Sequence, residues 1–328
     1  MYNYLFTLKL YNKNDTIYRG DKMRLLTRSD FDGLACGVLF RELGMIDEWK
    51  FVHPKDIQDG IVETNENDIL ANIPYVEGCG MWFDHHSSET ERLGNLQGFK
   101  GVSKLAPSAA HVVYEYYGGE SNPKLLKFKE MIHYVDKVDS GDLTIEEIKE
   151  PKGWILLGFI MDPRTGLGRF RDFTISNYEL MLKLMEECRI KNIDSILNLP
   201  DVLERVRLYY QQDKLFKEML VKYTTVHKNV ILTDLRGVET IYTGNRFLIY
   251  SLYPSQNISI WVVDGRAKLN CSIACGYSVI NRSSKTDIGS LMYKYGGGGH
   301  KQVGTCQVPY DEADDAIKKL IRQMNIDG

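Results

Sequence analysis

Apolar and polar residues follow two different periods along the first part of the chain. Residues 23–43 begin with an apolar strand that contains Leu25 and Leu26, pass through an acidic turn, and continue with apolar residues at helical spacing. Residues 67–75 and 78–86 predict two further strands, each of which ends on polar residues. In open α/β sheets, ligands collect beyond the carboxyl ends of the strands. The pattern therefore predicts an α/β domain in which one site is built from several strand ends.

The rest of the chain is first helical and then rich in strands. From Pro107 to about Leu220, apolar residues recur at helical intervals, and residues 201–226 predict a connecting helix. Beyond this helix, apolar and polar residues alternate in four stretches that predict strands, namely 229–235, 246–254, 258–265 and 268–278. A helix over residues 311–324 is expected to close the chain.

These elements predict an α/β protein with two domains joined by a helix. The N-terminal domain is expected to hold a parallel sheet with helices on both faces, and the smaller C-terminal domain to be mixed α/β. The predicted divisions are an N-terminal extension (1–22), the first domain (23–200), the connecting helix (201–226) and the second domain (227–328). Two interpretations of the extension stay open, a short extra hairpin or a start-site artefact, because Met23 begins a strand as a natural start would.

Composition narrows the class of protein. A chain of 328 residues with 43% hydrophobic and 26% charged residues, and no apolar run of about 18 residues, is typical of a soluble two-domain protein. The first residues lack the order of a signal peptide and the six cysteines form no CxxC pair, so we expect a cytoplasmic protein without a structural zinc site. A formal net charge of -3 argues against a protein that coats long nucleic acid, whereas short anionic substrates stay compatible with it.

The first motif with candidate chemistry is a pair of aspartates at the end of a strand. Asp30 and Asp32 precede Gly33, whose backbone permits a tight turn that aims both carboxylates at one corner. Paired carboxylates are the hard oxygen ligands that Mg²⁺ or Mn²⁺ prefer. The alternative interpretation is an aspartate that caps the following helix.

The second motif is Asp84, His85 and His86, which follow another strand directly. Adjacent histidines beside an aspartate at a strand end have no obvious packing role, and imidazole ligands favour Mn, Fe or Zn over Mg. The isolated histidines differ, because a structural role is expected for each of them, namely His53, His111, His133 and His227.

The third motif is a run of four glycines that ends on His300. Without side chains, the N–H groups of such a run can approach a phosphate or a base, although a flexible loop is the alternative. Arg282 and Ser283 lie upstream and supply groups that recognise anions. Residues 165–169 also contain two glycines, but no strand precedes them and no helix follows, so we predict a simple turn there.

Together the three motifs resemble those of the DHH phosphoesterase superfamily with its C-terminal DHH-associated (GGGH) domain, in particular its nanoRNase or oligoribonuclease members. Ser29–Gly33, Asp84–His86 and Gly296–His300 occur in the order and spacing of that family. Residues 278–304 resemble the Arg-Ser element, helix and glycine loop of the associated domain. The family includes nanoRNases, single-strand exonucleases, cyclic-dinucleotide phosphodiesterases and polyphosphatases or pyrophosphatases.

The resemblance implies a centre with two Mn²⁺ ions about 3.5 to 4 Å apart that hold an activated water. It assigns metal binding to Asp30, Asp32, Asp84 and His85. The fourth acidic element of the family is placed at Asp139, with Asp136 as the competing position. His86 is implied to steady the phosphate or the nucleophile rather than to bind metal.

Two departures from the family pattern affect this centre. Leu26 and Arg28 stand where the family usually carries a further His or Asp ligand. Asn72 stands where the family has an aspartate that bridges both metals, and a neutral carbonyl bridges poorly, so one metal or two is left open. Arg28 has its own interpretation as a catalytic residue, because its guanidinium could neutralise a phosphate oxygen as the missing cation would have done.

The resemblance therefore implies a metal-dependent phosphodiesterase that hydrolyses short single-stranded oligonucleotides (nanoRNA) to 5′-mononucleotides by a metal-activated water. Mn²⁺ is the expected cofactor and Mg²⁺ the alternative, with no membrane partner; RNA or DNA preference, direction of digestion, and a monomer or a homodimer are left open. The residues expected to bind the substrate are Arg282, Ser283, Gly297, Gly298, Gly299 and His300. The alternatives are an exopolyphosphatase or pyrophosphatase, and a catalytically impaired nucleotide-binding protein.

Overall fold

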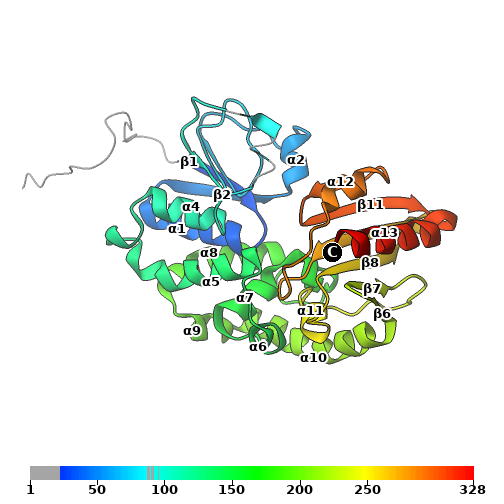
Figure 1. Cartoon of the computed structure of the whole chain (residues 1–328). Helices are drawn as coiled ribbons and strands as arrows, with labels where there is room; N and C mark the ends of the chain where they lie inside the picture. The colour runs from blue at the N-terminus through cyan, green and yellow to red at the C-terminus, as the bar shows by residue number, and fades with distance from the viewer. Residues whose placement is uncertain (1–22, 87–88, 90–91, 95) are drawn as a thin grey trace, which may run out of the picture.

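The computed structural model describes residues 23–328 apart from 87–88, 90–91 and 95 (Figure 1). The predicted extension over residues 1–22 lies outside the described residues. The described chain forms two sheets, a parallel one in the N-terminal half and a mixed one in the C-terminal part. The predicted α/β fold class is therefore confirmed.

The first sheet has five strands in the order β2-β1-β3-β4-β5, and every neighbouring pair is parallel. Its strands are β1 (Met23–Arg28), β2 (Ile46–Val52), β3 (Asp68–Ala71), β4 (Met81–Asp84) and β5 (Gly101–Ser103). Because the strands are parallel, the carboxyl ends of β1, β3 and β4 lie at one edge. The three predicted polar clusters follow these ends.

Alternating residues of the strands enter two different cores. Leu25 and Phe83 face the helices on one side of the sheet, whereas Leu26 and Trp82 face the other side. The first side is covered by α1 (Phe31–Leu43), α4 (Ala109–Tyr116), α5 (Lys129–Ser140), α7 (Gly153–Met161) and α8 (Asn177–Ile190). The second side carries the short helix α2 (Pro54–Gln58) and apolar loop residues. Two short helices, α6 (Ile145–Lys149) and α9 (Ile193–Leu197), complete the helical part.

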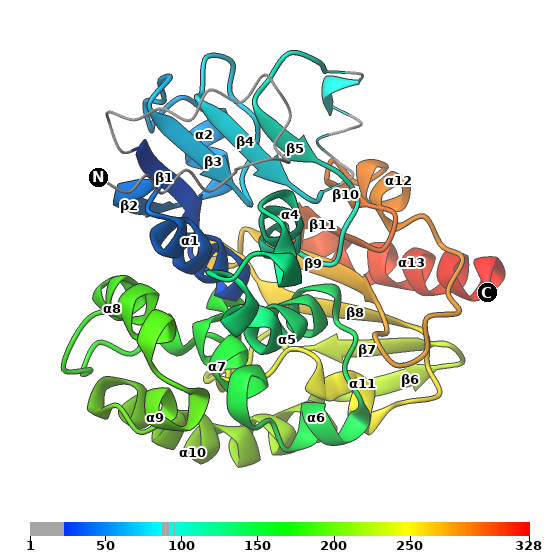
Figure 2. The same ribbon diagram turned by 90° about the vertical axis from the view of Figure 1, so that its left-hand side faces the viewer.

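A 24-residue helix, α10 (Pro200–Tyr223), connects the two sheets (Figure 2). It matches the connecting helix expected over 201–226, except that the chain turns into strand β6 already at Thr224. Pro200 lies in the first turn, where its missing N–H leaves no hydrogen bond unmade. The division into domains itself stays a prediction.

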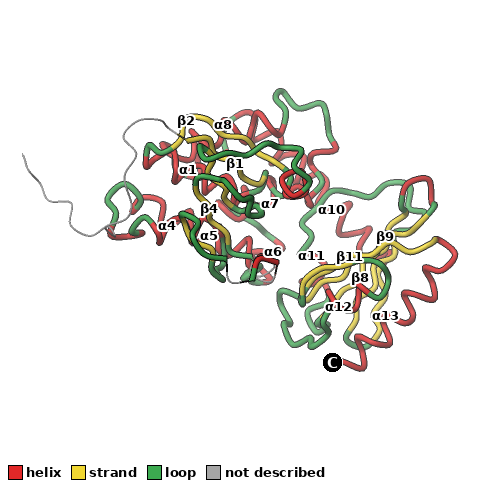
Figure 3. Tube along the Cα trace, turned by 90° about the horizontal axis from the view of Figure 1, so that it is seen from above, coloured by secondary structure: helices red, strands yellow, loops and turns green. Residues whose placement is uncertain are grey.

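The second sheet has six strands in the order β10-β11-β9-β8-β7-β6, with only β7 and β8 parallel to each other. Its strands are β6 (Thr224–His227), β7 (Val230–Asp234), β8 (Ile258–Asp264), β9 (Asn270–Tyr277), β10 (Gly298–His300) and β11 (Val303–Pro309). One face packs on α12 (Ile288–Tyr293) and α13 (Ala313–Asp327) (Figure 3).

One predicted strand is wrong. Residues 246–254 form the short helix α11 (Leu248–Leu252) instead. The side chain of Asn245 accepts a hydrogen bond from the Phe247 backbone N–H and turns the chain before the helix. The consecutive residues Leu248, Ile249 and Tyr250 are all buried, which a single helical turn inside a core permits and a half-exposed strand does not.

The face of the second sheet that α12 and α13 leave uncovered packs on the connecting helix. Phe216 of α10 stacks on Trp261 of β8, with ring centroids 6.4 Å apart and planes 16° from parallel. The same core continues into the helices around the first sheet, so the two parts share one apolar interior. None of the described helices combines the length and the continuous apolar character that a membrane-spanning segment requires.

Candidate metal centre

Asp32 is held by the start of helix α4. Its Oδ2 accepts a hydrogen bond from Ala109 N at 2.9 Å, and its Oδ1 accepts one from Ala110 N at 2.7 Å. Both N–H groups belong to the first turn of the helix, where they have no partner within the helix itself and favour a negatively charged acceptor. Even so, burial raises the pKa of Asp32 well above its usual range, and the neighbouring Asp139 and Asp30 raise it further. A bound cation would stabilise the charged form of this buried carboxylate.

His85 offers a free nitrogen to the same point. Its Nδ1 donates to the carbonyl oxygen of Ala106 at 3.1 Å, which leaves Nε2 unprotonated in the neutral ring. That Nε2 is buried without a hydrogen-bond partner among the described residues, 3.4 Å from Asp139 Oδ2 and 3.7 Å from Asp32 Oδ2. The ligand atoms of Asp32, His85 and Asp139 all lie within 4.8 Å of one another. This donor set fits a divalent cation such as Mn²⁺.

The fourth acidic position is occupied by two aspartates one helical turn apart on α5. Asp139 lies beside His85, whereas Asp136 accepts hydrogen bonds from Ser108 Oγ at 2.6 Å and from His111 Nδ1 at 2.8 Å. Asp136 is therefore used to secure helix α4 against α5. The structure brings Asp139, and not Asp136, to the cluster.

Asp30 already has three partners. Its Oδ1 accepts from Gly33 N at 2.9 Å and from Asn72 Nδ2 at 3.0 Å, and its Oδ2 lies 3.0 Å from Arg28 Nε. Asp30 thus caps helix α1, as the alternative interpretation of the motif had it. Gly33 is required at this turn, because a Cβ there would lie 2.0 Å from the carbonyl oxygen of Arg28.

Asp84 is turned toward its neighbour in the motif. Its Oδ1 accepts from His86 Nδ1 at 2.9 Å and its Oδ2 from His86 N at 3.3 Å. Burial alone would lower the pKa of His86, but the hydrogen bond and charge of Asp84 outweigh it and raise that pKa. Leu26 is buried in the core on the opposite side of the sheet. Asp30 and Asp84 thus make hydrogen bonds within the protein, and the ligand atoms that lie together for one cation are those of Asp32, His85 and Asp139. Metal binding by Asp30 and Asp84 stays a prediction.

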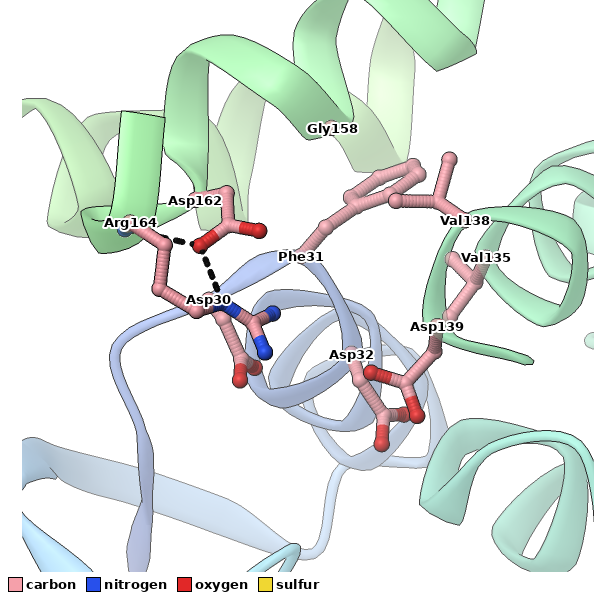
Figure 4. Close-up of a pocket in the computed structure, with 9 residues that line it drawn as sticks. All are labelled: Asp30, Phe31, Asp32, Val135, Val138, Asp139, Gly158, Asp162 and Arg164. Carbon is pink, nitrogen blue, oxygen red and sulfur yellow. Dashed lines mark hydrogen bonds and ion pairs between the residues drawn. The ribbon is translucent and has the colours of Figure 1, made fainter. Parts of the chain in front are cut away.

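Three residues near the cluster were missed by the sequence interpretation. Arg164 and Asp162 line one small pocket with Asp30, Asp32 and Asp139 (Figure 4). The third, Arg246, pairs with Asp162 through Nε at 3.3 Å. For Asp162 and Arg164 the sequence offers only a weak signal, an Asp-Pro-Arg run after a predicted helix. For Arg246 it offers none, because this residue lies 84 positions after Asp162.

The predicted substrate-binding residues lie in the C-terminal part. Arg282 reaches the end of α5, where its Nη2 donates to Gly141 O at 2.8 Å and to Ser140 O at 3.3 Å. Ser283 Oγ accepts from Asn257 Nδ2 at 3.1 Å. The glycine run forms part of the edge strand β10, where a Cβ at Gly297 or Gly299 would meet β11 backbone oxygens at 2.0 and 2.2 Å. His300 is exposed at the end of this strand.

Comparisons with known proteins identify relatives through structure. Models of protein families return no match to the chain, and neither do curated proteins. The pGpG-specific phosphodiesterase PggH from Vibrio cholerae is 49% identical, with a TM-score of 0.82, over 94% of this chain and 100% of that one. An uncharacterised protein from Helicobacter pylori is 16% identical, with a TM-score of 0.35, over 93% of this chain and 99% of that one. RecJ from Thermus thermophilus, in complex with Mg²⁺, is 12% identical, with a TM-score of 0.47, over 93% of this chain and 49% of that one.

The last two likenesses are distant, so the assignment depends on the Vibrio cholerae enzyme and on the motifs. Half of the aligned residues are shared with that phosphodiesterase, and the alignment spans both sheets. The predicted family and the predicted hydrolase class are thereby confirmed. The chain belongs to the DHH phosphoesterase superfamily and is a phosphoesterase.

Proposed function

We propose that the chain is a metal-dependent phosphodiesterase that hydrolyses short 5′-phosphorylated oligonucleotides, with a dinucleotide such as pGpG as its substrate, to 5′-mononucleotides. The observation that carries this proposal is the orphaned, buried Nε2 of His85 between the carboxylates of Asp32 and Asp139. The likeness to a pGpG-specific enzyme supports the choice of a dinucleotide over longer RNA. A net charge of -3 also suits a short substrate.

One cation is assigned to the centre, with Asp32, His85 and Asp139 as its ligands and Mn²⁺ as the ion ahead of Mg²⁺. When bound, such an ion activates a water for attack and neutralises charge on the phosphate. Arg28 and Asn72 compensate Asp30 without a second ion, because a guanidinium and an amide N–H occupy its two oxygens. Asp84 is assigned the role of orienting His86 through a hydrogen bond, and not that of a metal ligand.

The other residues of the site bind and orient the phosphodiester. His86 is aligned by its Nδ1 bond to Asp84, which also raises its pKa, and in the protonated ring Nε2–H donates a hydrogen bond to a phosphate oxygen. The side chain of His86 is 35% exposed and can therefore reach a bound ligand. Arg28 is 33% exposed and offers its terminal nitrogens to the same ligand while Nε holds Asp30.

The C-terminal residues are assigned to the end of the oligonucleotide. The edge strand β10, which follows Gly297 and contains Gly298 and Gly299, keeps His300 exposed at the edge of the second sheet. Arg282 and Ser283 fix the preceding loop against α5 and Asn257, and their role is to hold this surface toward the centre. Exonuclease action on longer nanoRNA, a cytoplasmic location and a homodimer stay predictions.

The direct test is release of GMP from pGpG by the purified protein with Mn²⁺, together with the number of bound ions. Wild-type protein is expected to bind one Mn²⁺ per chain and to cleave pGpG. The Asp139→Asn variant should lose both, because it removes a ligand charge beside His85. The matched control is Asp136→Asn on the same helix, which should keep the bound ion.

The alternatives predict different results in the same assay. Phosphate release from polyphosphate but no cleavage of pGpG would establish a polyphosphatase or pyrophosphatase. Binding of pGpG without turnover, in a protein that holds no Mn²⁺, would establish the impaired nucleotide-binding protein.

A further inference from the structure

Two arginines share one carboxylate at the mouth of the metal centre. Asp162 ends helix α7, and its Oδ1 accepts from Arg164 N at 2.8 Å and from Arg164 Nε at 2.7 Å. The other oxygen, Oδ2, accepts from Arg246 Nε at 3.3 Å. In both pairs the carboxylate holds the inner nitrogen of the guanidinium. The outer nitrogens of both residues are left for another partner.

The outer nitrogens of Arg164 point toward the acidic cluster. Figure 4 shows the guanidinium of Arg164 beside the carboxylate of Asp30, with its Nε directed back to Asp162, and Asp32 and Asp139 line the same pocket. Neither Nη1 nor Nη2 of Arg164 or Arg246 makes a hydrogen bond to any described residue. The two side chains are 45% and 34% exposed, so water or a ligand reaches them.

The charge of the two arginines is only partly matched by Asp162 itself. Two guanidinium groups face the single carboxylate of Asp162, and the carboxylates of Asp30 and Asp139 supply the remaining negative charge beside Arg164. Burial would raise the pKa of Asp162, but Arg164 and Arg246 outweigh burial and lower it. Burial and the nearby Arg164 lower the pKa of Arg246. Two like charges held together are favourable where an anion binds both of them.

The positions of both arginines are secured by three hydrogen bonds between two distant segments. Arg169 donates from Nη1 to Ile241 O at 2.9 Å and from Nη2 to Thr243 Oγ1 at 2.9 Å. Gly244 N donates to Thr165 O at 3.2 Å. The turn at 163–169, which carries Arg164, is therefore joined to the segment that carries Arg246. The guanidinium of Arg246 is also placed over the ring of Phe247, at 4.0 Å.

We propose that Arg164 and Arg246 bind the phosphodiester group that is hydrolysed, with Asp162 as the residue that positions them. The proposal rests on the proposed function, because it concerns the same centre. Arginine suits this role, since its planar outer nitrogens bind two phosphate oxygens at once and stabilise the charge that grows on them during attack. Arg164 is a catalytic residue in this assignment, and Arg246 supplies the second guanidinium from the C-terminal side.

Steady-state hydrolysis of pGpG and of GpG, which lacks the terminal phosphate, tests the proposal. Arg164→Ala and Arg246→Ala should each lower kcat/KM about 100-fold on both substrates. For Arg164→Ala the loss should lie mainly in kcat and should be partly rescued by added guanidinium ion. Arg164→Lys, which keeps the charge but not the planar geometry, should remain impaired. The number of Mn²⁺ ions bound should stay at the wild-type value in all of these variants.

Two further variants separate binding from structure. Arg236 is the control, because Asp234 at the end of β7 and Asp314 hold its guanidinium and it does not line the pocket, so Arg236→Gln should leave kcat/KM unchanged. Asp162→Asn should lower kcat by less than Arg164→Ala, and Asp162→Glu should restore part of that loss.

The outcomes that overturn the proposal are distinct. A loss confined to pGpG would place the arginines on the terminal phosphate instead, and unchanged kinetics or a failed guanidinium rescue would give them a purely structural role. If wild-type protein does not cleave pGpG, the proposed function fails, and the arginines are tested by calorimetric titration of the Mn²⁺-loaded protein with inorganic phosphate. In that case, equal phosphate affinity for wild type and Arg164→Ala overturns the inference independently.

Discussion

Asp30 and Asp32 stand two residues apart but meet entirely different neighbours. Asp30 is bound by Arg28, Gly33 and Asn72, whereas Asp32 is bound by two backbone N–H groups of α4. The sequence places both carboxylates at the end of a strand, because the motif and the apolar run before it are local. It does not reveal their partners, since Asn72 is 42 residues away and the α4 amides are 77 and 78 residues away. The local pattern therefore predicts the position of both carboxylates, and tertiary contacts decide which partners each of them has.

The exchange Asn72→Asp tests whether the asparagine at this position has removed the binding site of a second metal ion. The Nδ2 of Asn72 donates to Asp30, so the exchange replaces a donor with a second buried carboxylate. The metal-free protein should lose about 1–3 kcal/mol of stability, because two acceptors then face each other without a proton or cation. The number of Mn²⁺ ions bound per chain, measured by calorimetric titration, should rise from one to two. Added Mn²⁺ should bring the melting temperature of the variant back to that of the wild-type protein. Asn72→Ala is the control, which removes the donor without adding charge and should stay at one ion.

His111 gives a pH-dependent prediction for stability. Its hydrogen bond to Asp136 is the main cause that raises its pKa, with burial opposing and Glu115 adding to the effect. A raised pKa in the folded state stabilises the fold below the unfolded value of about 6.5, and this contribution is lost as pH rises through the folded pKa. His111→Gln should therefore cost roughly 0.5–1 kcal/mol near pH 5.5, since the pair is partly screened by water, and much less near pH 9. Urea denaturation at the two pH values measures the difference.

The control for this experiment is His227 on β6, whose Nε2 meets the hydroxyl of Thr225. His227→Gln removes a ring that meets a hydroxyl and not a carboxylate, and it measures the cost of losing the ring itself. An equal loss at both pH values for His111→Gln would show that the ring acts through packing and not through its charge.

At the scale of elements, helix α7 decides how closely the ligand-bearing helices approach. Gly158 of α7 lies against Phe31 of α1 and Val138 of α5, and these two helices carry Asp32 and Asp139. The sequence predicts helices in this region because their apolar spacing is regular, but it cannot show that α7 meets the ring of Phe31. The same limit explains residues 246–254, where an apolar run allows a strand or a buried helical turn and only the surrounding core decides.

Gly158→Ala should separate the helices around the centre. A Cβ there would lie 3.0 Å from Phe31 Cδ1 and 3.1 Å from Val138 Cγ1, both in buried side chains that have little room to move. We expect a loss of about 1–3 kcal/mol in the free energy of unfolding and a weaker affinity for Mn²⁺. Thermal denaturation and metal titration measure the two effects.

A second buried helical glycine offers a matched comparison. At Gly37 of α1 the added Cβ would meet the flexible end of Met185, at 2.4 Å from Cε, and that side chain can turn away. Gly37→Ala should therefore be much less destabilising, and the higher helix propensity of alanine offsets part of its cost. Equal stability of the two variants would mean that α7 does not pack tightly on α1 and α5.

At the scale of the whole molecule, the two sheets share one apolar interior through helix α10. Phe216 packs on Trp261 of the second sheet, while the same core extends to Leu25 of the first. The sequence predicts two sheets and a connecting helix because each element has its own period. It does not predict that the helix is a shared part of the core, since the residues on both of its faces are known only after the sheets are placed. Arg246 reaches Asp162 across this same junction.

A shared core predicts that the two parts unfold together. Phe216→Ala should lower the free energy of unfolding by about 3–5 kcal/mol, because it leaves a cavity at the junction. Leu320→Ala should lower it by about 2–5 kcal/mol, because it leaves a cavity in the separate core beneath α13. If the coupling through α10 is strong, Leu320→Ala still melts in one transition, with far-UV and near-UV circular dichroism changing at the same urea concentration. Phe216→Ala weakens the coupling itself, so the two signals should separate in that variant. Separate transitions already in the wild-type protein would contradict this, and they would mean that α10 connects two independently folded domains whose contact contributes little to the stability of the metal centre.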